Sequence, residues 1–306
     1  MNIITLTLNP AIDVHLRADE LTPSGYNTAR FLRRDSGGKG INVSRALGAW
    51  GVDSLCYAVI GEDNAEEFAA PVAREGINIV YSTVKGRVRE NINIQHPESE
   101  TVIAMQGPSL DKLAVERAER DLSAHVNRDT VLCFSGSLSE GTDKDAVLSL
   151  LYRMKSLGAR LVIDTRSLSI EEIISLRPYL IKPNEAEALA LTGMSADGME
   201  RAAEIAIALR DMGCENVLLT LGEGGAALAS ADGVFVADAP DITPVSTVGA
   251  GDSTIAGFLS SRTSGADALA LSVAFGSAAC LSEGTSPPDP CQIKRLLAEI
   301  RVKQYM

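Results

Sequence analysis

Short apolar runs alternate along this chain with longer stretches in which apolar residues recur at every third or fourth position. The runs are typical of strands buried on both faces of a sheet, and they cover residues 3–8, 55–60, 130–135, 161–164, 180–182 and 217–220. The longer stretches are typical of amphipathic helices, and they cover residues 113–122, 145–157, 185–191 and 199–212. This alternation predicts an α/β fold whose mostly parallel central sheet has helices on both faces.

Two segments, residues 11–35 and 87–105, do not follow the alternation. In the second segment, apolar pieces at 92–95 and 101–105 flank a polar, turn-like stretch at 96–100. We expect both segments to form short β-pieces. Because no low-complexity linker divides the chain, we also expect one domain over residues 1–306 that contains these pieces.

Composition and charge narrow the class of protein. The chain has 306 residues, 45% of them hydrophobic, which is enough for one large core. The net charge of −12, with no basic run, argues against nucleic acid and anionic membranes as partners. We expect no signal peptide over residues 1–14 and no membrane-spanning stretch. The five cysteines are scattered and never form a C-x-x-C pair, so we expect neither disulfides nor a zinc site, and a cytoplasmic protein.

A turn of small residues, Gly249, Ala250 and Gly251, precedes an apolar helical pattern and is followed at once by a carboxylate, Asp252. Free N–H groups and the helix dipole at such a start attract a phosphoryl group, and the glycines let the backbone approach it. A carboxylate there is poorly suited to bind an anion, but it is suited to take a proton from a hydroxyl that attacks one. The simpler alternative is that Asp252 caps the helix.

A second glycine-rich turn, at Gly37 and Gly38, leads into another helical pattern. Lys39 supplies a positive charge there and Asn42 a side-chain amide, which together suit a sugar phosphate. Neither turn has the spacing of the P-loop of nucleotide triphosphatases. A third glycine-rich stretch, residues 222–227, leads into strand-like residues at 226–229 and 233–237 where a dinucleotide fold needs a helix, so we reject a Rossmann site.

Further short motifs accompany these turns in order along the chain, and they are Thr7-Leu8-Asn9-Pro10-Ala11-Ile12-Asp13, Arg89-Glu90-Asn91, Ser135-Gly136-Ser137-Leu138, Asp164-Thr165, Lys182-Pro183-Asn184-Glu185-Ala186-Glu187 and Thr220-Leu221-Gly222. With them the chain resembles the ribokinase-like carbohydrate kinases of the PfkB family, and within it the phosphosugar branch of 1-phosphofructokinases and tagatose-6-phosphate kinases. The resemblance spans nearly the whole chain. The order and spacing of the motifs together are far more specific than any one of them.

The resemblance implies a three-layer ribokinase-like fold that transfers a phosphoryl group from ATP to a small phosphorylated ketose. Residues 11–35 and 87–105 would form a small β lid over the sugar, which in this family often meets the lid of a second subunit in a homodimer. Asp252 would be the catalytic base, with the N–H groups of Ala250 and Gly251 holding the charge that develops on the γ-phosphate. Asp13, at the end of the first strand, would grip sugar hydroxyls. The other expected substrate contacts are Gly37, Gly38, Lys39, Asn42, Arg89, Asn91, Ser137, Asp164 and Arg166.

The resemblance also assigns the nucleotide and metal sites. Asn184 and Glu187 match an Asn-x-x-Glu signature that organises Mg²⁺ in the family, often through water. The alternative for this pair is a helix N-cap followed by an acidic residue of the first turn, and both roles are compatible. ATP would contact Lys182, Asn184, Thr220, Gly222, Gly225 and Val248. Four cations would offset the negative net charge near the two anionic ligands, namely Lys39, Arg89, Arg166 and Lys182.

Three positions depart from the family pattern and bear on the substrate more than on the reaction. Val88 stands where a Thr usually precedes the phosphate-binding Arg, Ser139 where Pro is common, and Thr28 where some members have an Arg in the lid. We expect D-fructose 1-phosphate to be phosphorylated at O6. Tagatose-6-phosphate kinase and 6-phosphofructokinase activities stay open, because these ketoses differ only in phosphate position or one hydroxyl. A sugar-phosphate sensor without turnover is the alternative from another class.

Overall fold

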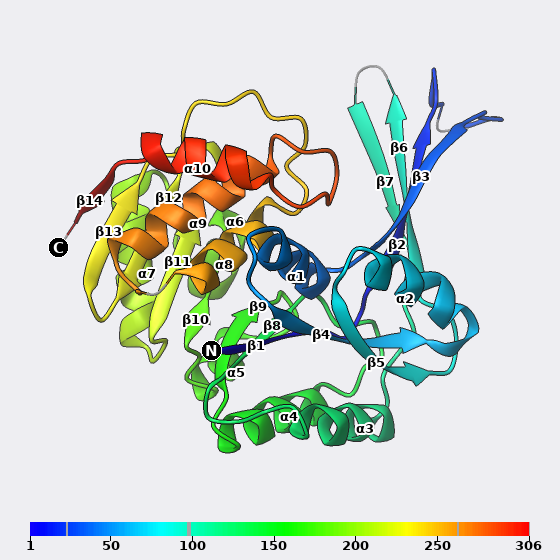
Figure 1. The fold of residues 1–306 in the computed structure, drawn as a ribbon, viewed down its shortest axis with the longest axis horizontal. Coiled ribbons are helices and arrows are strands. Elements are labelled where there is room, and N and C mark those ends of the chain that lie inside the picture. Colours follow the sequence, from blue (N-terminus) through cyan, green and yellow to red (C-terminus); the bar gives the residue numbers. More distant parts are fainter. Residues whose placement is uncertain (23, 97–98, 262, 306) are drawn as a thin grey trace.

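The computed structural model describes residues 1–22, 24–96, 99–261 and 263–305, which contain two sheets (Figure 1). The larger sheet has ten strands in the order β14-β13-β12-β11-β10-β9-β8-β1-β4-β5. Their bounds are β1 (Asn2–Thr7), β4 (Ser54–Gly61), β5 (Asn78–Val84), β8 (Thr130–Ser135), β9 (Arg160–Asp164), β10 (Leu180–Ile181), β11 (Asn216–Thr220), β12 (Ala226–Ser230), β13 (Gly233–Ala237) and β14 (Val302–Gln304).

The strand pairing of this sheet is parallel from β5 across to β11 and antiparallel at the β12–β14 edge. The six strands predicted from apolar runs are confirmed, each within two residues at either end. The strand-like residues after the third glycine-rich stretch are β12 and β13, which confirms the rejection of a Rossmann turn. The carboxyl ends of the parallel strands therefore share one edge, where ligands bind in such folds.

Helices cover both faces of the large sheet. One face packs against α3 (Lys112–Ser123), α4 (Lys144–Ser156), α5 (Ile170–Ser175), α6 (Glu185–Thr192) and α7 (Met199–Asp211). The other packs against α1 (Lys39–Ala49), α2 (Ala65–Arg74), α8 (Ala250–Ser260), α9 (Ala266–Ala279) and α10 (Pro290–Glu299). Two single-turn 3₁₀ helices are η1 (Glu62–Asn64) and η2 (Gly222–Gly224). Among the described residues, no helix is long and apolar enough to cross a membrane.

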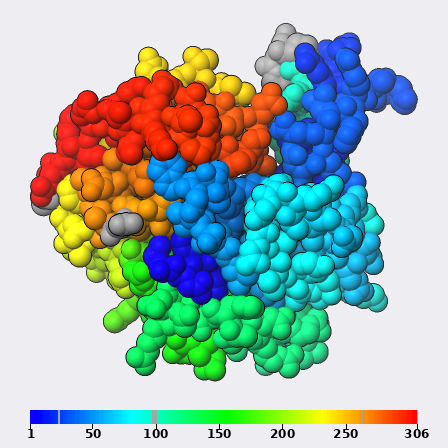
Figure 2. Space-filling model, viewed as in Figure 1, coloured from blue at the N-terminus to red at the C-terminus, as the bar shows by residue number. Residues whose placement is uncertain are grey.

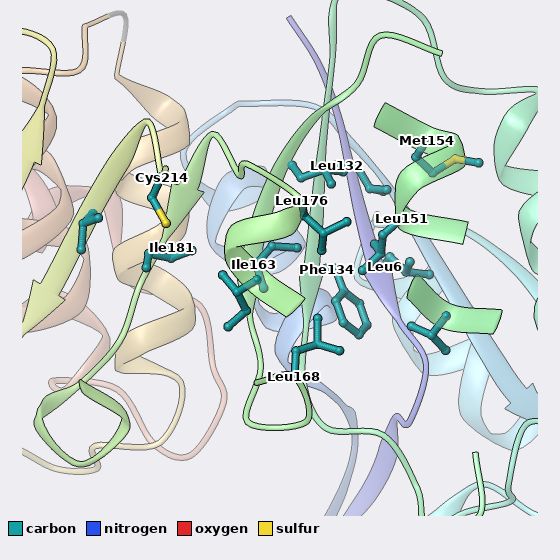
Figure 3. Close-up of a cluster of buried hydrophobic side chains, with 14 of the residues drawn as sticks. Leu6, Leu132, Phe134, Leu151, Met154, Ile163, Leu168, Leu176, Ile181 and Cys214 are labelled. Atoms are coloured by element: carbon teal, nitrogen blue, oxygen red, sulfur yellow. The ribbon is translucent and has the colours of Figure 1, made fainter. Parts of the chain in front are cut away.

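Alternate side chains of the central strands enter hydrophobic clusters on opposite faces of the sheet. On β1, Ile4 and Leu6 point to the face of α3 and α4, whereas Ile3 joins the opposite core with α1 and α8. Figure 3 shows the first core, in which Leu6 and Phe134 from neighbouring strands lie beside Leu151 of α4. Because both faces are buried, the central strands carry runs of mostly apolar residues, and this is the pattern that made them predictable.

The smaller sheet, called the lid here, contains β2 (Ala11–Arg17), β3 (Arg30–Gly37), β6 (Arg89–His96) and β7 (Ser99–Ala104), in the order β3-β2-β6-β7. It projects from the body at the upper right of Figures 1 and 2. The expected β-pieces are confirmed, although residues 97–98 of the predicted turn lie outside the described residues. The placement of Asp13 at the end of the first strand is wrong, because β1 ends at Thr7 and Asp13 lies within β2. The single-domain organisation stays a prediction.

Candidate active site

Asp252 lies in the first turn of α8, but it does not cap the helix. Gly249 is the N-cap residue, with the left-handed φ of 78° that glycine adopts readily, and no side chain caps this end. Asp252 is the third helical residue and is buried at 6% exposure. The capping interpretation is therefore wrong. The backbone amide of Ala250, one of the two expected to hold a phosphoryl group, makes only a long 3.4 Å bond to the carbonyl of Thr247.

Asn42, at the end of the first turn of α1, contacts this carboxylate. Its side-chain amide donates a hydrogen bond of 2.8 Å to Oδ2 of Asp252, and its Oδ1 accepts one from the guanidinium of Arg45. Both ends of the amide thus have protein partners. Asn42 was expected to bind substrate, and the structure instead places it on the candidate base.

Two lysines enclose a second buried carboxylate, Asp164, at the end of β9. Lys39 at the start of α1 lies 2.9 Å from Oδ2 of Asp164, and Lys182, directly after β10, lies 3.6 Å from Oδ1. Asp164 was expected to contact the sugar, but its carboxylate faces these two cations. The three residues come from three segments that meet at the carboxyl edge of the sheet.

These charges set opposite protonation states for the two carboxyl groups. Burial favours the neutral form of Asp164, but the charges of Lys182 and Lys39 outweigh it and lower the pKa of Asp164. Burial raises the pKa of Asp252 to about 7, and the negative charge of Asp164 acts in the same direction. Burial also disfavours the charge on Lys39, but Asp164 and Asp252 prevail and raise the pKa of Lys39. Asp252 is thus poised to exchange a proton near neutral pH.

The lid contributes a cluster of polar side chains where its strands join the body of the protein. Asn91 of β6 donates a 2.8 Å hydrogen bond to Oδ1 of Asp13 on the adjacent β2. A Cβ atom on Gly37 would lie 2.7 Å from Oδ2 of Asp13, so glycine is needed for this close approach. Burial raises the pKa of Asp13. The sequence predicted each of these residues as a sugar contact, and the structure brings them together.

Several buried polar atoms near this group have no hydrogen-bond partner: Oγ1 of Thr7, Oδ1 of Asn9, Nε of Arg89 and Oδ1 of Asn91. Asn9 connects these atoms to the segment after β8, because its side-chain amide donates a hydrogen bond of 3.4 Å to Oγ of Ser137. Burial lowers the pKa of Arg89, which the charge of Asp13 opposes. Buried polar groups are nearly always satisfied in a complete structure, so this cluster has the character of a site for a polar ligand. Sequence reasoning missed Asn9, although it stands in one of the motifs.

Asn184 and Glu187 form a complete capping box at the start of α6. The Asn184 side chain accepts from the amide of Glu187 at 2.9 Å, and the Glu187 carboxylate accepts from the amide of Asn184 at 3.1 Å. The other oxygen of Glu187 accepts from Nε of Arg166 at 3.0 Å. The side chain of Arg166, a residue expected to contact the substrate, is 73% exposed and pairs with Glu187.

The side-chain oxygens of Asn184 and Glu187 are the ligand type that Mg²⁺ prefers. Each of these oxygens, however, already accepts a hydrogen bond from the protein. In the described residues, no three acidic, histidine or cysteine side chains lie close enough to ligate a metal together. Mg²⁺ commonly keeps several waters and binds phosphate oxygens directly. The pair therefore fits an ion held through water and not one ligated directly. Arg166, Lys182 and Glu187 line a cavity of about 570 Å³ beside α6.

Three residues expected to contact ATP, Thr220, Gly222 and Gly225, lie around the turn between β11 and β12. Thr220 pairs with Asn184 across an isolated parallel bridge. Gly222 has a φ of 56°, and Gly225 lies so close to the chain after β13 that a Cβ atom would be 2.0 Å from the carbonyl of Ala237. Val248, half exposed, precedes α8. The contact of Thr220 with Asn184 joins this turn to the start of α6.

A buried carboxylate at a helix start able to hold an anion, with two lysines beside it at the carboxyl edge of the sheet, is an arrangement suited to a phosphotransferase of α/β fold that acts on a hydroxyl. Residues 6–291 match the model of the pfkB family carbohydrate kinases, and the chain belongs to this family. It is 30% identical to the 1-phosphofructokinase of Bacillus subtilis over 98% of this chain and 99% of that one, and 31% identical to that of Borreliella burgdorferi over 98% of both. The solved structure of phosphofructokinase-2 from Escherichia coli in complex with potassium superposes with a TM-score of 0.89 at 25% identity, covering 97% of this chain and 98% of that one.

Proposed function

We propose that this kinase transfers the γ-phosphoryl group of ATP to O6 of D-fructose 1-phosphate, giving fructose 1,6-bisphosphate. The observation that carries the proposal is Asp252, a buried carboxylate with a pKa of about 7 at a helix start able to hold an anion. Asp252 takes the proton of the attacking hydroxyl, and the N–H groups of Ala250 and Gly251 face the charge that develops on the transferred group. The 1-phosphofructokinases among its relatives support the choice of ketose.

The proposed orientation places the phosphate already on the sugar at the base of the lid. Arg89 is the cation there, with an unpartnered Nε, while Asp13 and Asn91 beside it take sugar hydroxyls. Gly37, Gly38 and Ser137 line the same end. Lys39, which the sequence predicts as a contact of the sugar phosphate, is better suited to the reacting end, because its charge interacts with both Asp164 and Asp252.

ATP lies along the turns that carry Thr220, Gly222, Gly225 and Val248, with its phosphates directed toward Lys182. A divalent metal accompanies ATP in this family, and we propose Mg²⁺, held by Asn184 and Glu187 through water. When bound, the ion neutralises charge on the phosphates, which offsets the repulsion from a protein of net charge −12.

We further propose a homodimer formed through the lids. The lid exposes large apolar side chains, with Phe31 at 61% and Ile103 at 51% exposure, and in the strand register each lies opposite an apolar partner, Leu16 and Ile92. Leu32 of β3 and Met105, directly after β7, are exposed as well. Contiguous exposed apolar surface of this kind marks interaction sites.

We also propose a cytoplasmic location. Three buried free thiols, Cys56, Cys133 and Cys214, favour a reducing compartment such as the cytoplasm.

A coupled assay of ADP release tests the proposal, with fructose 1-phosphate, fructose 6-phosphate, tagatose 6-phosphate, fructose and ribose as acceptors. The expected result is the highest kcat/KM for fructose 1-phosphate. A preference for tagatose 6-phosphate or fructose 6-phosphate would change the substrate but not the reaction. A preference for an unphosphorylated sugar would overturn the role of Arg89, and tight binding without ADP release from any acceptor would identify a sensor.

A further inference from the structure

Arg45 is a buried arginine on α1, one helical turn beyond Asn42 and outside every motif used above. Only 6% of the residue is exposed. Its guanidinium is shared among three segments, since it pairs with the carboxylate of Glu75 after α2, donates to the carbonyl of Ser36 in β3, and donates to Oδ1 of Asn42 at 3.1 Å. Charged side chains are rarely so buried unless they are paired, as Arg45 is with Glu75.

The contact with Arg45 determines which way the Asn42 amide faces. An amide has one acceptor end and one donor end. Because the guanidinium has only donors, the oxygen of Asn42 turns toward Arg45, and the NH₂ group is left to donate to Asp252 at 2.8 Å. In the opposite orientation, donors would face the guanidinium and an oxygen would face the carboxylate. Arg45 therefore selects the amide orientation that holds Asp252.

The same guanidinium also restrains the end of the lid. Ser36, whose carbonyl accepts from Arg45, directly precedes Gly37, and Gly37 lies against Asp13 in the proposed sugar site. Arg45 thus contacts the candidate base through Asn42 and the lid strand through the backbone. We propose that Arg45 is a positioning residue for phosphoryl transfer, which orients Asp252 through the Asn42 amide. The inference rests on the proposed role of Asp252 as the base.

The proposal has a consequence for the pH dependence of turnover. Asp252 faces Lys39 and Asn42 from α1, Asp164 from β9 and Lys182 after β10. Of these, the hydrogen bond from Asn42 stabilises the carboxylate and lowers its pKa. Without Arg45 the amide is free to turn, so the acid limb of the kcat/KM profile should move to higher pH, and kcat should fall.

The test uses Arg45→Lys in the full-length chain, in the wild type and in an Asn42→Ala background. Lysine keeps a charge opposite Glu75 but lacks the planar fork that reaches three acceptors. We expect Arg45→Lys alone to lower kcat by about 10- to 100-fold. If Arg45 acts through Asn42, the same substitution in the Asn42→Ala background should change kcat by less than about twofold.

Glu75→Gln is the matched control, because it breaks the ion pair of Arg45 at the surface without altering Asn42, and its kcat should stay near that of the wild type. Should Arg45→Lys not fold, as judged by thermal melting, Arg45→Gln replaces it in the same comparison. Equal losses of kcat in both backgrounds, or an unshifted pH profile, would overturn the proposal. Undiminished turnover by Asp252→Asn would instead show that the proposed base is wrong.

Discussion

Lys182 lies directly over Gly251, with its Nζ atom 3.1 Å from the position that a Cβ atom would take on that glycine. The same ammonium lies 3.6 Å from Asp164. Gly251 is therefore small because a cation occupies the space above the first turn of α8. This places a positive charge and the free end of a helix on the same side of the turn, which suits a transferring phosphoryl group.

Gly251→Ala should displace Lys182 without unfolding the helix, because Gly251 lacks a positive φ and only a flexible side-chain end blocks the methyl group. We expect kcat to fall by about tenfold. Steady-state kinetics with a coupled ADP assay measure it. Gly48→Ala is the matched control, since nothing lies within 4 Å of its Cβ position on α1, and it should leave kcat unchanged.

Asp252→Asn should abolish turnover while the sugar phosphate still binds. Asparagine keeps the shape of the side chain but cannot accept the proton, and loss of a general base lowers rates by about 10²- to 10⁴-fold. Calorimetric titration with fructose 1-phosphate checks binding, and the coupled assay checks turnover. Near-normal kcat at saturating substrate would contradict the assignment of the base.

The raised pKa of Asp252 predicts two dependences on pH of opposite sign. Turnover needs the ionised base, so kcat/KM should rise as the pH increases through about 7. Folded Asp252 binds its proton more tightly than the unfolded residue does, so stability is lost as the pH rises from the ordinary value of 3.8 to about 7. Asp252→Asn lacks this loss. The free energy of unfolding of Asp252→Asn, relative to that of the wild type, should therefore increase by about 2–3 kcal/mol between roughly pH 5 and pH 8. Denaturant titration of both proteins measures this difference.

Glu187→Gln should raise the Mg²⁺ concentration needed for half-maximal activity and lower kcat, with little change in sugar affinity. Glutamine preserves the capping box, so a change in stability is not expected to confound the result. The measurement is a Mg²⁺ titration of turnover at saturating ATP. Superimposable titration curves for the two proteins would remove Glu187 from the metal site.

Arg89→Ala should raise the KM for the phosphosugar far more than the KM for ATP. A charge-assisted contact with phosphate contributes about 1.5–3 kcal/mol, which corresponds to a rise of about 10- to 100-fold. Arg87→Ala is the control two residues away, because Arg87 is 58% exposed and pairs with Glu67 outside the proposed site. Equal effects of the two substitutions would contradict a specific phosphate contact by Arg89.

The sequence was sufficient where local pattern decides the structure. Strands buried on both faces consist of apolar runs, and the glycine turn before Asp252 precedes a helix with a left-handed N-cap at Gly249. Asp13 was misplaced because the apolar pattern continues from β1 into β2 with little interruption, so it does not mark where the chain leaves the large sheet.

Contacts between distant segments could not be predicted in the same way. Lys39 lies in a motif that suits a sugar phosphate, but its partner Asp164 is 125 positions away, and Asn42 contacts Asp252 across 210 positions. Arg45 carries no signal at all, because an arginine on a helix is ordinarily a solvated residue. Such partners are determined by the topology that packs α1 against α8 and brings Lys39, at the start of α1, to the end of β9.

The pairing of Asn42 with Asp252 also governs when the enzyme becomes active during its synthesis. The two residues lie near opposite ends of the chain, and the strands that place Asp164 and Lys182 come between them. A nascent chain that has folded β1 to β11 still lacks α8, and so has no base. The onset of activity should therefore follow the synthesis and folding of α8, and products truncated before Asp252 should be inert even where most of the sheet has formed.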